Sequence, residues 1–203
     1  MATVLTDQAQ HAITQAVLAL LAGADGVAIA SAANPIPVAP GVGGAVISAS
    51  NPMPVAGQAY SASATFTPAA ASHVAGDVNG GAQSIAFGAI SASRVMITSA
   101  ALEIDGGTAE ATAWRLYLYN VTPPSALADD AAFDLPSGDR ASYLGYVDLG
   151  TAVDLGSTQW VETNIINKQI KLAGTGVFGY LVNLTTLTPA NVAHIVTLHA
   201  VGL

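Results

Sequence analysis

Hydrophobic and polar residues alternate over short runs throughout residues 60–203. The runs are rich in Val, Ile, Thr and aromatic residues, and Gly, Asn and Asp separate them, which is typical of strands joined by turns. The predicted strands are residues 60–66, 84–90, 95–105, 111–120, 143–149, 159–166, 168–173, 177–184 and 193–201. No convincing helical pattern lies between them. The sequence therefore predicts a mostly β domain, an antiparallel β-sandwich that is jelly-roll-like.

Two of these strands alternate most clearly and indicate which side chains form the core. In the first strand, one face carries Met96, Thr98, Ala100, Leu102 and Ile104. In the second strand, one face carries Trp114, Leu116 and Leu118. Since alternate residues point to the same side of a sheet, we predict both sets to be buried. Asp105-Gly106-Gly107 between the strands predicts a tight hairpin turn.

The opposite face of the second strand carries Arg115, Tyr117 and Tyr119. Arg and Tyr are enriched at protein interfaces, so this strip is a candidate subunit interface. The alternative is that the long loop of residues 123–140 covers Tyr117 and Tyr119. The sequence leaves both interpretations open.

The chain before this domain has a different pattern. Ala9, Ile13, Val17 and Leu20 recur at three- and four-residue steps, which predicts a short amphipathic helix within residues 6–22. From residue 26 to residue 57, prolines and glycines exclude a helix and favour extended backbone. We therefore predict two parts: residues 1–57, a helix and an extended docking arm, and residues 58–203, the β-sandwich.

One phrase occurs twice in this arm, at residues 28–38 and again at residues 45–55, and each copy ends in Asn-Pro-X-Pro-Val. One interpretation is a duplicated hairpin or loop within a single subunit. We favour the other, in which each copy adds a strand to an exposed sheet edge of a partner protein and the prolines end the pairing. The predicted docking residues are Ile29, Asn34, Pro35, Ile36, Pro37, Val38, Val46, Ile47, Asn51, Pro52, Met53, Pro54 and Val55.

The scarcity of charge supports an assembly component. Charged residues make up 9% of the chain, compared with roughly 25% in an ordinary soluble domain. Surface charge opposes association, so much of this surface is expected to be buried in contacts. The formal net charge of −8 makes nucleic acid an unsuitable partner. The apolar run at residues 16–22 is too short to span a membrane, and the start of the chain does not match a secretory signal.

Candidate catalytic and ligand-binding motifs are weak. The sequence has no cysteine, and its four histidines have no metal-binding spacing. Residues 174–179 match G-x-G-x-x-G but precede a predicted strand, so we interpret them as a turn. Glu103 and Asp105, with Glu110 across the turn, are a candidate glycosidase pair or calcium site, and we interpret them as a solvated rim.

Aspartates also crowd the long loop, at Asp129, Asp130, Asp134 and Asp139, where a stabilising cation is an alternative. Their spacing does not match a calcium-binding loop. We predict no catalytic residue, no cofactor and no metal, and hence no enzyme.

Three runs resemble small virion structural proteins of tailed bacteriophages: Trp-Arg-Leu-Tyr-Leu-Tyr-Asn at residues 114–120, Ala-Asp-Asp-Ala-Ala-Phe-Asp-Leu at residues 128–135 and Tyr-Leu-Gly at residues 143–145. The resemblance covers residues 60–203. It implies a β-sandwich held on a capsid or tail and carries no catalytic residues.

The leading hypothesis from this resemblance is a capsid decoration or cement protein. It would be made in the host cytoplasm, form a homo-oligomer (a trimer is favoured) and bind the major capsid protein or other virion proteins through its arm. The alternative is a tail or fibre component with a glycan-binding sandwich.

Overall fold

The computed structural model describes residues 58–90 and 92–203. This part forms nine strands: β1 (Ala59–Phe66), β2 (Val78–Ala86), β3 (Arg94–Ile104), β4 (Ala113–Tyr119), β5 (Tyr143–Thr151), β6 (Val153–Asp154), β7 (Gln159–Lys171), β8 (Gly176–Asn183) and β9 (His194–Gly202). The mostly β fold is thus confirmed for this region. No described helix is long and apolar enough to cross a membrane. The predicted helix and docking arm lie outside the described residues.

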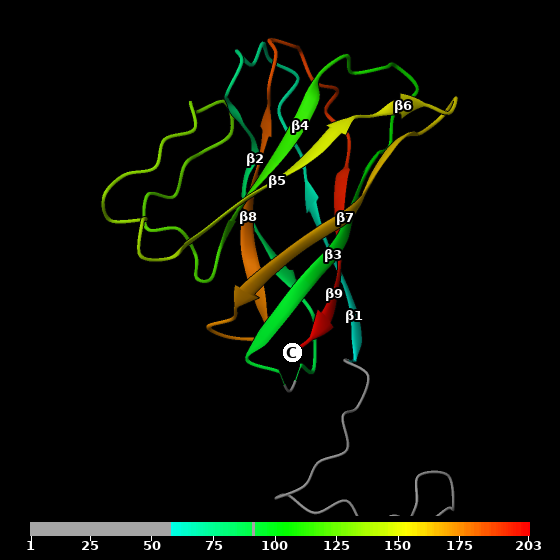
Figure 1. The fold of residues 1–203 in the computed structure, drawn as a ribbon. Helices are drawn as coiled ribbons and strands as arrows, with labels where there is room; N and C mark the ends of the chain where they lie inside the picture. Colours follow the sequence, from blue (N-terminus) through cyan, green and yellow to red (C-terminus); the bar gives the residue numbers. More distant parts are fainter. Residues whose placement is uncertain (1–57, 91) are drawn as a thin grey trace, which may run out of the picture. The chain divides into compact units, whose positions relative to one another are not determined.

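The strands form two antiparallel sheets (Figure 1). One sheet has the order β1-β9-β3-β7-β6 and the other has the order β2-β8-β4-β5. The pairs are nested along the chain: β1 pairs with β9, β2 with β8, β3 with β7 and β4 with β5. Such nesting arises when one long hairpin is rolled into two facing sheets, and it is the strand order of a jelly roll.

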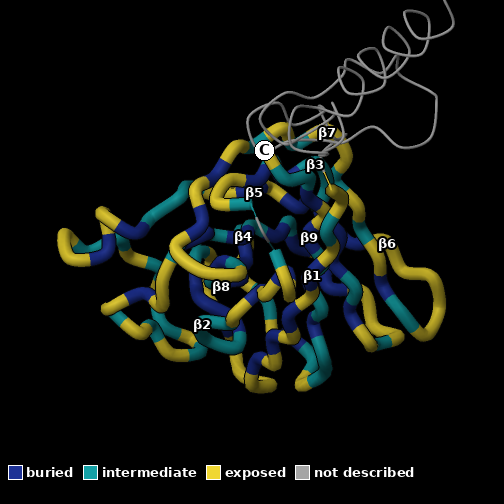
Figure 2. Tube along the Cα trace, turned by 90° about the horizontal axis from the view of Figure 1, so that it is seen from below, coloured by how far each residue is buried: buried dark blue, intermediate teal, exposed yellow. Residues whose placement is uncertain are grey.

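The hydrophobic core lies between the inner faces of the two sheets. Buried positions run along the strands, while exposed positions gather in the connecting loops (Figure 2). Large side chains that are fully buried come from both sheets and include Phe66, Ile97, Leu102, Trp114, Leu116, Leu118 and Leu181. The prediction that Trp114, Leu116 and Leu118 belong to the core is confirmed.

The prediction for β3 is correct only in its second half. Ala100, Leu102 and Ile104 are buried, whereas Met96 and Thr98 are partly exposed. The register with both neighbouring strands shifts between Ile97 and Ser99. A bulge of this kind moves the following residues to the opposite face. Before it, the core positions are therefore Val95 and Ile97.

The hairpin predicted at Asp105-Gly106-Gly107 is wrong. β3 and β4 belong to different sheets, so the segment between them crosses from one sheet to the other. Gly107 instead allows the backbone of this segment to lie close to that of Gly156. A Cβ atom on Gly107 would lie only 2.9 Å from the carbonyl oxygen of Gly156. Two clearly alternating strands joined by a glycine-containing segment are therefore not always paired with each other. Here the segment connects one sheet of the sandwich to the other.

Two further differences involve bulges and close packing. The predicted strands 159–166 and 168–173 are one strand, β7, interrupted by Ile165 and Asn167 with positive φ angles of 67° and 49°. The turn predicted for residues 174–179 is confined to residues 174–175, because β8 begins at Gly176 and includes Gly179. A Cβ atom on Gly176 would overlap the backbone of Ile85 in β2, so the glycine permits the two strands to pair.

Candidate functional site

A cluster of aromatic side chains covers the outer face of the four-stranded sheet, together with the loop between β4 and β5. We call it the aromatic cluster: Tyr117, Tyr119, Phe133, Tyr143, Tyr146 and Tyr180. The ring of Phe133 stacks on Tyr117 with 3.7 Å between ring centroids. Tyr119 meets Tyr180 edge to face at 5.8 Å. The edge-to-face pair has a geometry that aromatic rings prefer.

The long loop packs on this cluster. Besides Phe133, the loop residues Leu127 and Leu135 pack on it, and the backbone N–H of Leu127 donates a hydrogen bond of 2.9 Å to Tyr180 Oη. The loop thus covers the tyrosines of β4, which is one of the two interpretations that the sequence left open. Tyr119 is fully buried within the subunit, so its side chain is not available to a neighbour. Arg115 and Tyr117 are partly exposed, and an interface at these two residues stays a prediction.

The aspartates of the loop accept hydrogen bonds that close it. Asp129 accepts from the N–H of Ala69 at 2.9 Å and of Gly80 at 2.6 Å. Asp139 accepts from both the N–H and the hydroxyl of Ser125. These contacts occupy carboxylate oxygens that the sequence offered to a cation. Within residues 58–90 and 92–203, no group of three His, Asp or Glu side chains is arranged to hold a metal ion.

Burial governs the protonation of two tyrosines in the cluster. It raises the pKa of Tyr119 above the ordinary value, and the nearby negative charge of Asp139 raises it further. Burial also raises the pKa of Tyr143. The hydroxyl of Tyr119 has no hydrogen-bond partner among the described residues. Both tyrosines therefore remain neutral phenols that pack, because a phenolate is costly in so dry an environment.

The aromatic cluster reaches solvent at Tyr146, which is 45% exposed. The guanidinium of Arg115 lies 4.1 Å from the centroid of the Tyr146 ring, and Arg115 Nε donates a hydrogen bond of 2.7 Å to Asp148 Oδ1. The hydrogen bond to Asp148 raises the pKa of Arg115. An exposed ring beside a fixed guanidinium and carboxylate offers both a stacking surface and hydrogen-bonding groups to a polar ligand.

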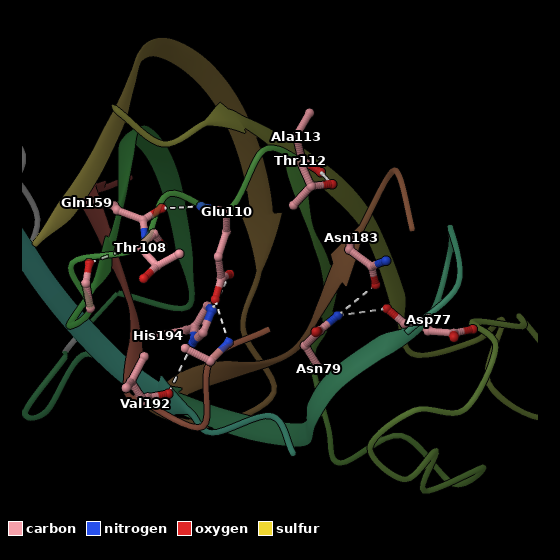
Figure 3. A network of polar contacts seen from close by, with 12 residues as sticks. Asp77, Asn79, Thr108, Glu110, Thr112, Ala113, Gln159, Asn183, Val192 and His194 are labelled. Carbon is pink, nitrogen blue, oxygen red and sulfur yellow. Dashed lines mark hydrogen bonds and ion pairs between the residues drawn. The ribbon is translucent and has the colours of Figure 1, made fainter. Parts of the chain in front are cut away.

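A second arrangement, a buried polar network, lies at one end of the sandwich (Figure 3). His194, at the start of β9, places its Nε2 atom 2.8 Å from Glu110 Oε2. Its Nδ1 atom lies 3.1 Å from the carbonyl oxygen of Val192. Since both ring nitrogens face oxygen acceptors, a proton lies between His194 and Glu110. The other oxygen of Glu110 accepts from the N–H of Ala190 at 2.8 Å.

Gln159 extends this network to the loop that follows β3. Its Oε1 atom accepts from the N–H of Glu110 at 2.8 Å, and its Nε2 atom donates to the carbonyl oxygens of Thr108 and Gly106 at 2.6 and 3.3 Å. The network joins three segments: the β3–β4 connection, the start of β7 and the β8–β9 connection. A half-open depression of about 370 Å³ borders Glu110 on its outer side.

Glu110 is therefore not part of a solvated rim, and that interpretation was wrong for this residue. It is buried, whereas Asp105 is exposed and Glu103 is partly exposed on the outer face of β3. The His194–Glu110 pair has no sequence motif, because Glu110 comes from the β3–β4 connection and His194 from the start of β9. The sequence feature that the two residues share is that each is a titratable residue close to the end of a strand.

A neighbouring buried pair holds the start of β2 to the end of β8. Asn79 Nδ2 donates to Asn183 Oδ1 at 2.9 Å, and Asn183 Nδ2 donates to the carbonyl oxygens of Val74 and Thr185, each at 2.8 Å. His73 is also fully buried nearby in sequence, and its ring nitrogens lie 3.9 Å from carboxylate oxygens of Asp129 and Asp130. These polar side chains organise loops around the end of the sandwich.

The thirteen predicted docking residues, between Ile29 and Val55, all lie outside the described residues. Two polar arrangements of the described residues are therefore candidate functional sites. One is Tyr146 with the partly exposed Arg115, and the other is the buried network.

Comparisons with known proteins give little similarity. No family model matches the chain, and no curated protein matches it. Among solved structures, a chain from the native virion of Kashmir bee virus at neutral pH is 12% identical, with 71% of this chain and 70% of that chain covered and a TM-score of 0.25. A chain from the full particle of Israeli acute paralysis virus heated to 63 degrees is 14% identical, with coverages of 73% and 70% and a TM-score of 0.19.

Proposed function

We propose that this chain is a structural protein of a virion, and within that class a capsid decoration or cement protein of the tailed-bacteriophage type. The jelly-roll strand order is compatible with this function, since viral capsids use the fold. Lectins and cupins use it as well, so the fold alone is an analogy.

The observation that carries the proposal is the uncharged, twice-written segment at residues 28–38 and 45–55. It is too apolar to remain a solvated linker and too rich in proline to form a core of its own. Docked on the major capsid protein or another virion protein, each copy would stabilise the shell by roughly 25 cal/mol for every Å² of apolar surface buried. The trimer favoured by the sequence-based hypothesis stays a prediction, and a two-fold contact between copies is a competing one.

The buried polar network supports a structural function over an enzymatic one. A catalytic acid or base must reach the proton that it transfers. Here the carboxylate of Glu110 is engaged by His194 and by the N–H of Ala190, and the imidazole of His194 is fully buried. These groups hold three connections together at the end of the sandwich.

The test adds the full-length chain to particles of its own virus that were assembled without it. The double variant Ile36→Asp with Met53→Asp places a charge in each docking copy and is expected to abolish co-sedimentation with the particles. The matched control, Val121→Asp with Leu155→Asp, adds the same charges at exposed apolar positions of the β domain and should bind normally. Undiminished binding by the first variant would exclude the docking function of the arm.

One observation favours a second candidate, a tail or fibre component that binds glycans. The exposed ring of Tyr146 next to Arg115 and Asp148 provides stacking and hydrogen bonds suited to a sugar. Glycan-array binding by the full-length chain that is lost in Tyr146→Ala would support this function. A decoration protein need not bind any saccharide, so the two functions are separable.

A further inference from the structure

The five-stranded sheet has a core-facing side and an outer side. We call the outer side the five-strand face. It consists of the residues that alternate with core positions along β1, β9, β3 and β7. In register across it lie Ser63, Thr197, Ala101 and Glu162. The long loop packs on the other sheet, on the side of the molecule away from β1, β9 and β3 (Figure 1).

Small side chains occupy the rest of the row that contains Glu162. Ser63 and Thr197 are hydrogen-bonded to each other at 2.8 Å between hydroxyl oxygens, and Ala101 is adjacent to Thr197. Short side chains with satisfied hydroxyl groups permit another flat surface to approach closely. Two sheets packed face to face lie about 10 Å apart.

Charges on this face are segregated toward its two ends. Glu103 and Glu162 lie toward the end of β3, on adjacent strands. Arg94 and Lys171 are directly opposite each other in register at the start of β3. The positions between these ends are mainly uncharged, and His199 lies near the centre, beside Ser99. The face therefore has an acidic end and a basic end about 30 Å apart, at roughly 3.3 Å per residue.

We propose that the five-strand face binds the same face of a second copy of this chain, about a two-fold axis that lies between the sheets and perpendicular to β3. This axis places each strand face to face with the same strand of the second copy, and the two run antiparallel. Arg94 then lies opposite the partner's Glu103, and Lys171 lies opposite the partner's Glu162. A two-fold axis parallel to the strands would instead place acid over acid and base over base, so the charges select the first arrangement.

The available area is sufficient for such a contact. Four strands give a face about 19 Å wide and about 30 Å long, hence roughly 600 Å² on each copy. Together the two copies bury about 1,200 Å², which is the lower limit for a stable, specific interface. An interface of this size depends on its charge pairs, so its affinity should fall with added salt. The proposal deepens the proposed assembly function by naming a face through which copies meet.

Sedimentation equilibrium of the full-length chain tests the contact. The expected result is a mass of two copies. Glu162→Lys alone, or Lys171→Glu alone, should raise the dissociation constant about tenfold, because symmetry makes each unfavourable pair occur twice. Combining both changes restores opposite charges and should return the constant toward that of the unmodified chain. The control Asp105→Lys makes the same charge change one residue beyond the end of β3 and should have no effect.

Three results would overturn the proposal: a monomer or a mass of three copies, single reversals that bind as well as the unmodified chain, or a double reversal that fails to recover. Circular dichroism of each variant would show that it is folded. Failure here would leave the particle-binding test unaffected, because that test depends on residues of the arm.

Discussion

His194 Nε2 and Glu110 Oε2 lie 2.8 Å apart in the interior, although Glu110 lies in the β3–β4 connection and His194 begins β9. Their side chains are 0% and 5% exposed. Removing one member of a buried hydrogen-bonded pair leaves the other without its partner, which costs more free energy than the bond itself contributes. The pair therefore fixes how the β3–β4 and β8–β9 connections meet.

Glu110→Ala is expected to lower the free energy of unfolding by about 1–3 kcal/mol, because it leaves the buried imidazole and the N–H of Ala190 without their acceptor. Urea unfolding monitored by tryptophan fluorescence would measure this, since Trp114 contacts His194 at 5.3 Å between ring centroids. Glu103→Ala is the control and should change stability by less than about 1 kcal/mol. Equal effects of the two changes would contradict the structural importance of the pair.

Tyr119→Phe is expected to be neutral or stabilising at pH 7, since it removes a buried hydroxyl with no partner. Burial raises the pKa of Tyr119 in the folded protein, so the native state holds this proton more tightly than the unfolded chain, in which a tyrosine has a pKa of about 10. The resulting stability is fully present below about pH 10 and is lost as the pH rises through the folded-state pKa.

The free energy of unfolding should therefore decrease above about pH 10, and it should decrease less steeply in Tyr119→Phe. Urea titrations at neutral and alkaline pH would show this difference. An identical alkaline slope in the two proteins would exclude Tyr119 as a source of the pH dependence.

Gly176→Ala is expected to destabilise the protein by about 2 kcal/mol or more, because the added Cβ overlaps backbone atoms of Ile85 and Ala86 that cannot move without breaking the sheet. Gly174→Ala is a matched control from the same glycine-rich turn, since no atom lies within 4 Å of its Cβ position. Thermal unfolding of both variants measures the difference. Equal melting temperatures would mean that β2 and β8 are not packed as closely as described.

Phe133→Ala is expected to release the long loop from the sheet, because it removes the ring stacked on Tyr117. Trypsin should then cleave after the exposed residue Arg140 more rapidly than in the unmodified chain, about tenfold if the loop loses roughly 1.4 kcal/mol of stabilisation. Val121→Ala, at an exposed position before the loop, is the control. Unchanged cleavage would show that Asp129 and Asp139 suffice to hold the loop.

The strands themselves were predictable because each records its environment locally, as alternation between apolar and polar residues. Six of the predicted runs each coincide with one observed strand to within a few residues, and two more together form β7. The run for β2 was placed late because Gly80 and Gly81 resemble a turn, although they form a bulge inside the strand. The bulge at Thr98 has no local signal either. Its effect, the exchange of inner and outer faces, could not be derived from alternation.

Pairing between distant segments was the part that the sequence could not determine. The tyrosines of β4 were recognisable as a strip, but whether a loop or a subunit covers them depends on contacts such as Phe133 with Tyr117. The His194–Glu110 pair depends on β3 and β4 entering different sheets, and the sequence indicated a hairpin there. One wrong assumption about a turn was enough to conceal the buried network.

The nested order of the strands also determines when the domain can be completed. β9 lies between β1 and β3, so during synthesis the five-stranded sheet lacks an inner strand until residues 194–202 have been made. β1 has no strand partner until then, because β1 pairs with β9. Contacts between such distant segments form slowly. A chain without residues 194–202 would therefore lack the continuous five-strand face.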